Sequence, residues 1–497
     1  MVFSSLIFLF AFLPVTLALY YIVPGRKARN WVLFLLSLVF YGWGEPVYIL
    51  VMLFSVVSAW GFGFLIGRHR ESSPKRARAW MAVSLSVNLA ALLFFKYANF
   101  FLSNLRLFPP LTDRISLIEG LTLPIGISFY TFQIMSYTID LYRGKTEVQR
   151  NFVAFGAYVT LFPQLIAGPI VRYRDVDDQL TDRRETVPLF SSGVRRFLIG
   201  LGKKVLIGDA CSRVYEYAKG TASFRATAVG AWMVMIFYTM HIYYDFSGYS
   251  DMAIGLGRMF GFRFLENFNY PYISGSITEF WRRWHMSLGN WFREYVYIPL
   301  GGNRKGKLKQ YRNIAVVWFL TGFWHGANWN YILWGVYFGA ILMLEKTFLL
   351  KILDRLPGFV RRLYAILLVG FGWILFSHTD LAAGWTCFVS LFGIGTEAFC
   401  TPTVGYELLH ALPLLLIAAV GATPWPAEIW NRLSGYRWCG EGAVTDTGEQ
   451  IPFTDTVLTA RGKVFAVLTT VGCILLLFVT TAYLVDSTFS PFLYFIF

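Results

Sequence analysis

Two histidines in apolar, aromatic sequence are the side chains best suited to chemistry. His285 ends the segment FWRRWH at residues 280–285, and His325 lies in GFWHGANW at residues 322–329. Residues 313–344 contain no Asp, Glu, Lys, Arg or second His. A run of this length can enter a bilayer, where a polar group is costly and is therefore a functional candidate. We predict that the function depends on His325, with a hydrogen-bonded structural role as the alternative.

The chemistry that a histidine supports in such surroundings is proton transfer. Apolar surroundings favour the neutral imidazole, which can accept a proton near neutral pH. Acyl transfer to an alcohol needs a base of this kind, which takes the hydroxyl proton as the oxygen attacks a carbonyl. Gly326 would let a substrate come close to His325, and Trp324 would form a wall. We assign Trp324 and Asn328 to the substrate site, and His325 and His285 to catalysis.

The segment that carries His285 is rich in aromatic residues at helical spacing. They are Trp281, Trp284, Trp291 and Tyr295, with Leu288 in the same series. Steps of three and four residues predict one continuous helix with one aromatic face. An amphipathic helix lying at the membrane surface would give the same pattern. We assign Trp284 and its neighbour Arg282 to the substrate site.

A basic loop separates the two histidines. Residues 301–312 begin with two glycines and contain no acidic residue, but they carry Arg304, Lys305, Lys307, Lys309 and Arg312. A glycine-containing basic loop suits a phosphate-bearing ligand, and it would serve an anionic lipid equally well. We predict that Arg304, Lys305 and Lys307 contact the substrate.

Two acidic residues occur in the apolar segment YYDFSGYSDMAIGLG, residues 243–257. Asp245 and Asp251 need partners in such a setting, either basic side chains or backbone donors. A structural ion pair is the more economical interpretation of each. We include Asp245 among the candidate substrate contacts.

The composition indicates whether this chain folds in water or in a membrane. Of its 497 residues 56% are hydrophobic and only 15% are charged, and the mean hydropathy is +0.52, which predicts a polytopic membrane protein. The net charge of +15 lies in short loops between apolar runs, as the positive-inside rule produces, so a nucleic-acid partner is excluded. The five cysteines are scattered and form no CxxC pair, so neither a disulfide framework nor a metal site is predicted.

The apolar runs predict an all-α fold with about eleven spans or re-entrant segments in one transmembrane domain, residues 1–497. The predicted runs are 1–25, 31–43, 47–67, 80–95, 121–139, 151–171, 226–244, 313–344, 363–379, 381–394, 408–422 and 464–485. Basic loops at 26–29 and 68–78 would face the cytoplasm, which places the N-terminus outside. Residues 172–204 predict helices at the interface with snorkelling basic side chains. Residues 240–345 form the expected catalytic region, and residues 424–463 form an expected hydrophilic loop.

Several motifs in order resemble the membrane-bound O-acyltransferase family. They are LPIGISFYTFQIMSY at 123–137, LFPQLIAGPIVRY at 161–173, the acidic segment at 243–257, FWRRWH, WHG at 324–326 and AYLVDSTFSPFLYF at 482–495. The likeness runs nearly from end to end of the chain. Within the family it is most similar to the bacterial members that acetylate secreted polysaccharides such as alginate.

The resemblance implies a helical bundle around a central tunnel in the plasma (inner) membrane. In the family the histidine of WHG, here His325, is catalytic, and the histidine of FWRRWH, here His285, lies in the same tunnel. The implied acetyl donor is acetyl-CoA, used from the cytoplasm and not as a bound cofactor. The implied partners are an exported SGNH-hydrolase-like acetyltransferase and the polysaccharide secretion machinery.

Two other functions stay open at this point. An acyltransferase could move D-alanine or another acyl group from a carrier protein to teichoic acid, lipid or protein. A transporter could instead use the interrupted helices as a substrate site, but it would usually show two related halves, and no internal repeat is visible in the sequence.

Overall fold

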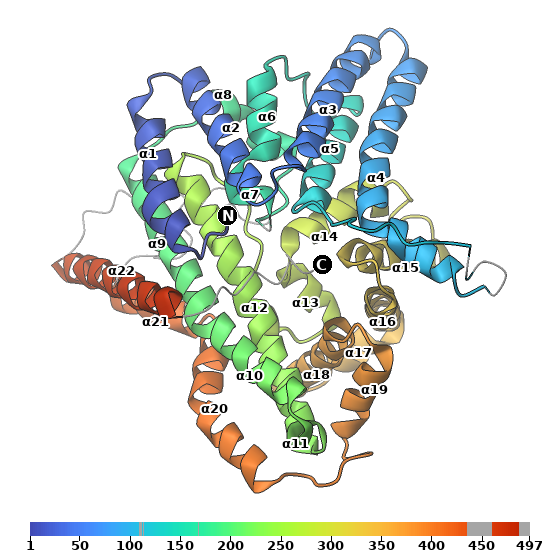
Figure 1. Ribbon diagram of the computed structural model, residues 1–497, viewed down its shortest axis with the longest axis vertical. Coiled ribbons are helices and arrows are strands. Elements are labelled where there is room, and N and C mark those ends of the chain that lie inside the picture. Colours follow the sequence, from blue (N-terminus) through green and yellow to red (C-terminus); the bar gives the residue numbers. More distant parts are fainter. Residues whose placement is uncertain (109–111, 113, 167, 435–459, 487–497) are drawn as a thin grey trace. The chain divides into compact units, whose positions relative to one another are not determined.

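The computed structural model describes residues 1–108, 112, 114–166, 168–434 and 460–486, in which helices are joined by loops (Figure 1). Within them there is no strand, only one isolated bridge between Thr227 and Ala398. The predicted all-α fold is confirmed. The chain divides into two compact units, one of residues 1–197 and 253–265 and one of residues 198–252 and 266–497.

The first unit follows the N-terminal predictions closely. Its helices are η1 Phe8–Phe12, α1 Leu13–Ile22, α2 Arg26–Gly42, α3 Ile49–His69, α4 Pro74–Leu105, α5 Ile127–Tyr142, α6 Phe152–Thr160, α7 Phe162–Leu165, α8 Tyr173–Thr181 and the start of α9 Val187–Gly202. Helices α2 and α3 meet at the predicted break, residues 44–46. The interrupted run 151–171 is divided between α6 and α7, because Leu161 leaves the helical conformation before Pro163.

The predicted snorkelling of basic residues in 172–204 is wrong for two of them. Arg183 and Lys204 are each only 2% exposed. Arg183 donates from Nε to Tyr20 Oη (3.0 Å) and from Nη1 to Asn30 Oδ1 (2.8 Å). Since a buried cation without partners is costly, these contacts hold the Arg183 side chain inside the first unit and away from lipid headgroups.

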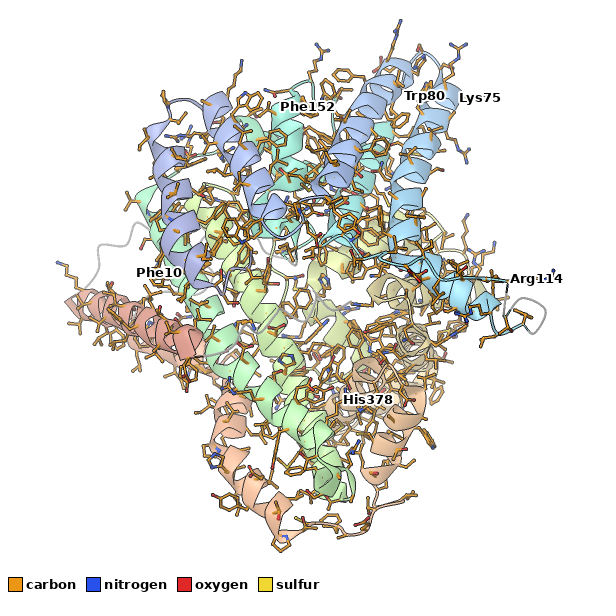
Figure 2. The ribbon with its side chains drawn as sticks, in the orientation of Figure 1. Phe10, Lys75, Trp80, Arg114, Phe152 and His378 are labelled. Carbon is orange, nitrogen blue, oxygen red and sulfur yellow. The ribbon has the colours of Figure 1, made fainter. Side chains whose placement is uncertain are left out.

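Among the residues that the structure describes, five helices are long and apolar enough to cross a membrane: α3, α4, α18 Gly358–Ser377, α20 Pro402–Gly421 and the greater part of α22 Ala460–Asp486. The expected count of about eleven therefore stays a prediction. Helix α4 extends beyond the predicted run 80–95 at both ends. Figure 2 shows Lys75 and Trp80 projecting near its N-terminal end and Arg114 beyond the other end.

The second unit carries the two histidines. Its elements are η3 Lys203–Gly208, α10 Asp209–Gly220, α11 Ala222–Arg225, most of α12 Ala228–Met259, η4 Pro271–Ile273, α13 Ile277–Arg283, α14 Met286–Phe292, η5 Arg293–Tyr297, α15 Lys307–His325, α16 Trp329–Leu344, η6 Glu345–Leu349, α17 Leu350–Leu353, α18, α19 Leu381–Ser390, α20, α21 Trp425–Ser434 and α22. The predicted loop 424–463 is helical at its start, in α21, while residues 435–459 lie outside the described residues, as does most of the C-terminal motif.

Helices α15 and α16 form an antiparallel hairpin whose backbones approach each other closely at glycines. A Cβ atom on Gly322 would lie 2.3 Å from the carbonyl oxygen of Tyr331, and one on Gly335 would lie 2.3 Å from that of Trp318. Side chains at these positions would push the helices apart, and His325 at the end of α15 would move with them. The hairpin thus depends on glycine at both positions.

We expect Gly322→Ala to lower the stability of the protein by about 1–3 kcal/mol, because the added methyl group overlaps the backbone of α16. Gly472→Ala in α22 is the matched control, since a Cβ there meets nothing within 4 Å. The measurement is thermal unfolding of both purified variants in detergent. Equal unfolding temperatures for the two variants would contradict the close packing of the hairpin.

Candidate active site

His285 lies at a break between two short helices. Its φ and ψ of 44° and 53° are in the left-handed region, between α13 and α14. The predicted continuous helix with one aromatic face is therefore wrong. Periodicity gives no warning of this break, because a left-handed residue other than glycine is held in place by tertiary contacts. Here the Met286 N–H donates to the carbonyl of Asn267 (3.0 Å) and the Asn269 N–H to that of Arg283 (2.9 Å).

The imidazole of His285 is 3% exposed and is bound on one side. Its Nδ1 lies 3.1 Å from Oδ1 of Asn267, and the ring of Phe246 meets it edge-on at a centroid distance of 4.7 Å. His285 is outside the helices that are long enough to span the membrane. Burial lowers the pKa of its side chain, so the imidazole is neutral at physiological pH.

His325 is the last residue of α15 and is 7% exposed. Its ring packs edge-on against Trp334 at 5.0 Å and against Phe376 at 5.3 Å. An imidazolium formed here would be favoured by the carbonyl end of the helix. The prediction that Gly326 admits a substrate does not fit the structure, because a Cβ there would lie 2.3 Å from the ring of Tyr331. The glycine makes room for Tyr331 instead.

One cavity of about 1040 Å³ in the second unit is lined by both histidines. Its cationic lining residues are Arg282, Arg293, Arg304, Lys305 and Lys346, and none of the lining residues among those described is acidic. Trp284 also contributes to the wall. Arg293 and Lys346 were not predicted. Lys346 comes from η6, after a whole hairpin, so no local pattern in the sequence could have connected it with His285.

The remaining predicted contacts lie outside the lining of this cavity. Trp324 packs at 6.3 Å from the ring of His285 and 5.0 Å from that of His325, and therefore contacts both histidines. The Asn328 side chain caps the N-terminus of α16. Lys307 begins α15 and is exposed.

The acidic residues of α12 form ion pairs within the second unit. Asp245 lies 3.4 Å from Nζ of Lys204, and Asp251 lies 2.7 Å from Nζ of Lys203. Asp245 is fully buried and is not among the cavity residues. These distances favour the structural interpretation of both carboxylates.

The basic loop is held by the helix that follows it. Asn313, in the second turn of α15, donates from Nδ2 to the carbonyl of Gly302 (2.9 Å), and Arg312 donates to the carbonyl of Leu300 (3.0 Å). The Arg312 side chain therefore stabilises the loop. Arg304 and Lys305 are the basic side chains of the loop that line the cavity.

The N-terminus of α13 is fixed by a buried carboxylate. Glu345, 1% exposed, accepts the backbone N–H groups of Ile277 and Thr278, both at 2.7 Å, and the hydroxyl of Tyr364 at 3.1 Å. A carboxylate at a helix N-terminus satisfies donors that have no partner within the helix. Glu345 thereby sets the position of the short helix that leads into His285.

The chain is similar to known proteins along its whole length. A profile described as the membrane-bound O-acyltransferase family matches residues 145–385. The chain is 40% identical over 509 residues to the protein named "Probable alginate O-acetylase AlgI" of Azotobacter vinelandii, with all of both chains covered. The chain belongs to the membrane-bound O-acyltransferase family. It is a membrane protein and an O-acyltransferase, and its resemblance to that family is confirmed.

Other members of the family differ in the group or acceptor in their names. The peptidoglycan O-acetyltransferase of Helicobacter pylori is 32% identical over 437 residues, with 80% of this chain and 81% of the relative covered. The teichoic acid D-alanyltransferase of Bacillus subtilis is also 32% identical, over 234 residues, with 45% of this chain and 59% of the relative covered. Transfer of an acyl group is common to these names, which supports the prediction of a membrane acyltransferase.

We expect Glu345→Ala to reduce acyl transfer by on the order of tenfold to a hundredfold, because the backbone N–H groups of Ile277 and Thr278 lose their acceptor and α13 shifts beside the cavity. Glu397→Ala is the control, since that glutamate is exposed in the same unit. The measurement is the turnover of each variant together with its unfolding temperature. Unchanged turnover in Glu345→Ala would show that the position of the catalytic groups does not depend on the hydrogen bonds of Glu345.

Proposed function

We propose that this chain moves acetyl groups from a cytoplasmic thioester donor, acetyl-CoA, across the membrane for O-acetylation of a secreted polysaccharide such as alginate. The observation that carries the proposal is one cavity lined by two histidines and five cations, without an acidic residue among the described lining. A phosphate-rich thioester fits that combination, because its phosphates pair with the cations and its carbonyl can reach a histidine. The choice of an acetyl group and of a polysaccharide acceptor in this proposal follows the names of two relatives that match at least 80% of this chain.

In the proposed reaction, Arg304 and Lys305 hold the phosphates of the donor. His325 takes the proton of the attacking hydroxyl while the new C–O bond forms. The C–S bond of the thioester then breaks, and His325 returns the proton to the leaving sulfur. The position of His325 at the carbonyl end of α15 favours the cation that exists between these two proton transfers.

The remaining parts of the proposal concern location and partners. We place the chain in the plasma (inner) membrane with its N-terminus on the exocytoplasmic side, because the basic loops at 26–29 and 68–78 then lie inside. An exported SGNH-hydrolase-like acetyltransferase would receive the acetyl group and place it on the polysaccharide. The secretion machinery would supply the glycan.

His325→Ala should lower the release of CoA from labelled acetyl-CoA by about 10²- to 10⁴-fold, the usual contribution of a general base. The protein is assayed in proteoliposomes with the exported partner and acceptor glycan, and the position of the label is followed. His410→Ala is the matched control, since His410 is exposed on α20 outside the cavity. Normal release in His325→Ala with intact protein would refute the assignment.

Replacing Arg304 and Lys305 together by glutamine should raise the KM for acetyl-CoA on the order of tenfold, equivalent to about 1.4 kcal/mol, and should change kcat less. The matched control replaces Lys307 and Lys309 by glutamine, which removes the same charge from neighbours that do not line the cavity. Steady-state kinetics at one ionic strength make the comparison. Equal KM values for the two double variants would assign the loop to lipid contact.

Transfer from an acylated carrier protein is the second candidate, since part of the chain matches a D-alanyltransferase. It predicts no CoA release by the wild type with any acceptor, and binding of an acylated carrier protein in preference to free CoA. The proteoliposome assay therefore separates the two donors.

A further inference from the structure

Asn267 is a buried polar residue that connects His285 to the rest of the second unit. It lies in the segment between α12 and η4 and is 1% exposed. Its Nδ2 donates to Oγ of Ser250 at 3.0 Å. On the other side of the amide, Oδ1 accepts the hydroxyl of Ser287 at 2.9 Å and the Ser287 N–H at 3.3 Å, and it lies 3.1 Å from Nδ1 of His285.

These contacts determine which end of the amide faces His285. A backbone N–H can only donate, so the amide atom that faces the Ser287 N–H is the oxygen. The same oxygen faces Nδ1 of His285. Two lone pairs at 3.1 Å would repel each other, so Nδ1 carries the hydrogen. The Ser287 hydroxyl lies closer to the amide oxygen than to Nδ1, 2.9 Å against 3.4 Å, and it points its hydrogen there.

The other ring nitrogen is then defined as well. A neutral imidazole with its hydrogen on Nδ1 has a lone pair on Nε2. Nε2 of His285 has no hydrogen-bond partner among the residues that the structure describes, and His285 lines the cavity. Nε2 is therefore the atom of His285 that is left for a ligand, and it can accept a hydrogen bond but cannot donate one.

We propose that Asn267 is a positioning residue that holds His285 as the Nδ1–H tautomer, so that Nε2 accepts a hydrogen bond from the hydroxyl group to be acylated. The assignment rests on the proposed function for the identity of this ligand, but the tautomer itself follows from the contacts of Asn267. The proposal gives the two histidines different roles. His285 orients the hydroxyl, and His325 carries the proton.

The backbone offers a way to test the side chain alone. The Met286 N–H donates to the backbone carbonyl of Asn267 at 3.0 Å, a contact that a substitution at residue 267 leaves in place. Asn267→Leu keeps the branching and the number of side-chain heavy atoms but has no acceptor. Asn267→Asp keeps an acceptor for His285 and Ser287 and loses the donor to Ser250. Ser250→Ala is the matched control, because it removes a partner of Asn267 on the side away from His285.

The experiment combines solid-state ¹⁵N NMR of histidine-labelled full-length protein in lipid with acetyl-transfer kinetics. The chain has six histidines, and the spectrum of His285→Gln identifies the signals of His285. In the wild type we expect a protonated Nδ1 and an unprotonated Nε2. Asn267→Leu should lose this pattern, and its kcat should fall about 10- to 100-fold with KM for acetyl-CoA unchanged.

Asn267→Asp and Ser250→Ala should both keep the wild-type tautomer and most of the kcat. A protonated Nε2 in the wild type would overturn the proposal, as would a wild-type signal or wild-type kcat in Asn267→Leu. An equal loss in Asn267→Asp and Asn267→Leu would also overturn it and make Asn267 a purely structural residue. If the wild type releases no CoA, the proposed function fails, while the spectra still decide the tautomer.

Discussion

Polar backbone groups that leave a helix inside a membrane protein must find partners within the protein, and this constraint shapes the whole site. His285 interrupts what would otherwise be one helix, and the interruption leaves donors and acceptors on both sides. At the break, the carbonyl of Arg283 accepts the N–H of Asn269, and the carbonyl of Asn267 accepts the N–H of Met286. Glu345 accepts the N–H groups at the other end of α13. Without these partners the break would cost several kcal/mol. The two short helices around His285 are stable because residues outside them provide hydrogen-bond partners for the backbone groups at their ends.

Aromatic packing supplies the rigidity that hydrogen bonds alone would not. Trp281 meets Trp334 edge-on at 5.4 Å, and Trp284 lies 5.0 Å from Trp373, so α13 is fixed against α16 and α18. Such ring pairs add stability beyond the apolar area that they bury. Trp334 also contacts His325. One aromatic cluster therefore supports both histidines, which explains why tryptophan is concentrated in this part of the chain.

Much of the fold could be predicted from the sequence, because apolar runs and their breaks are local signals. The hairpin at residues 44–46, the isolation of His325 and the basic loop are examples. The break at His285 could not be predicted, since its aromatic spacing is that of an intact helix. Asn267 and Lys346 were also missed. Each reaches the site through the fold, and nothing adjacent to either one in the sequence marks it.

The cationic lining of the cavity has a thermodynamic consequence. Arg282 and Lys346 repel each other, while Glu345, which attracts Lys346, does not line the cavity. The described lining therefore carries an excess of positive charge, and any polyanion that binds only the folded protein raises its stability by mass action. An anion that binds in this cavity therefore also contributes to the stability of the fold. Binding of an anion in the cavity and unfolding of the protein are therefore linked equilibria, so that a change in one shifts the other.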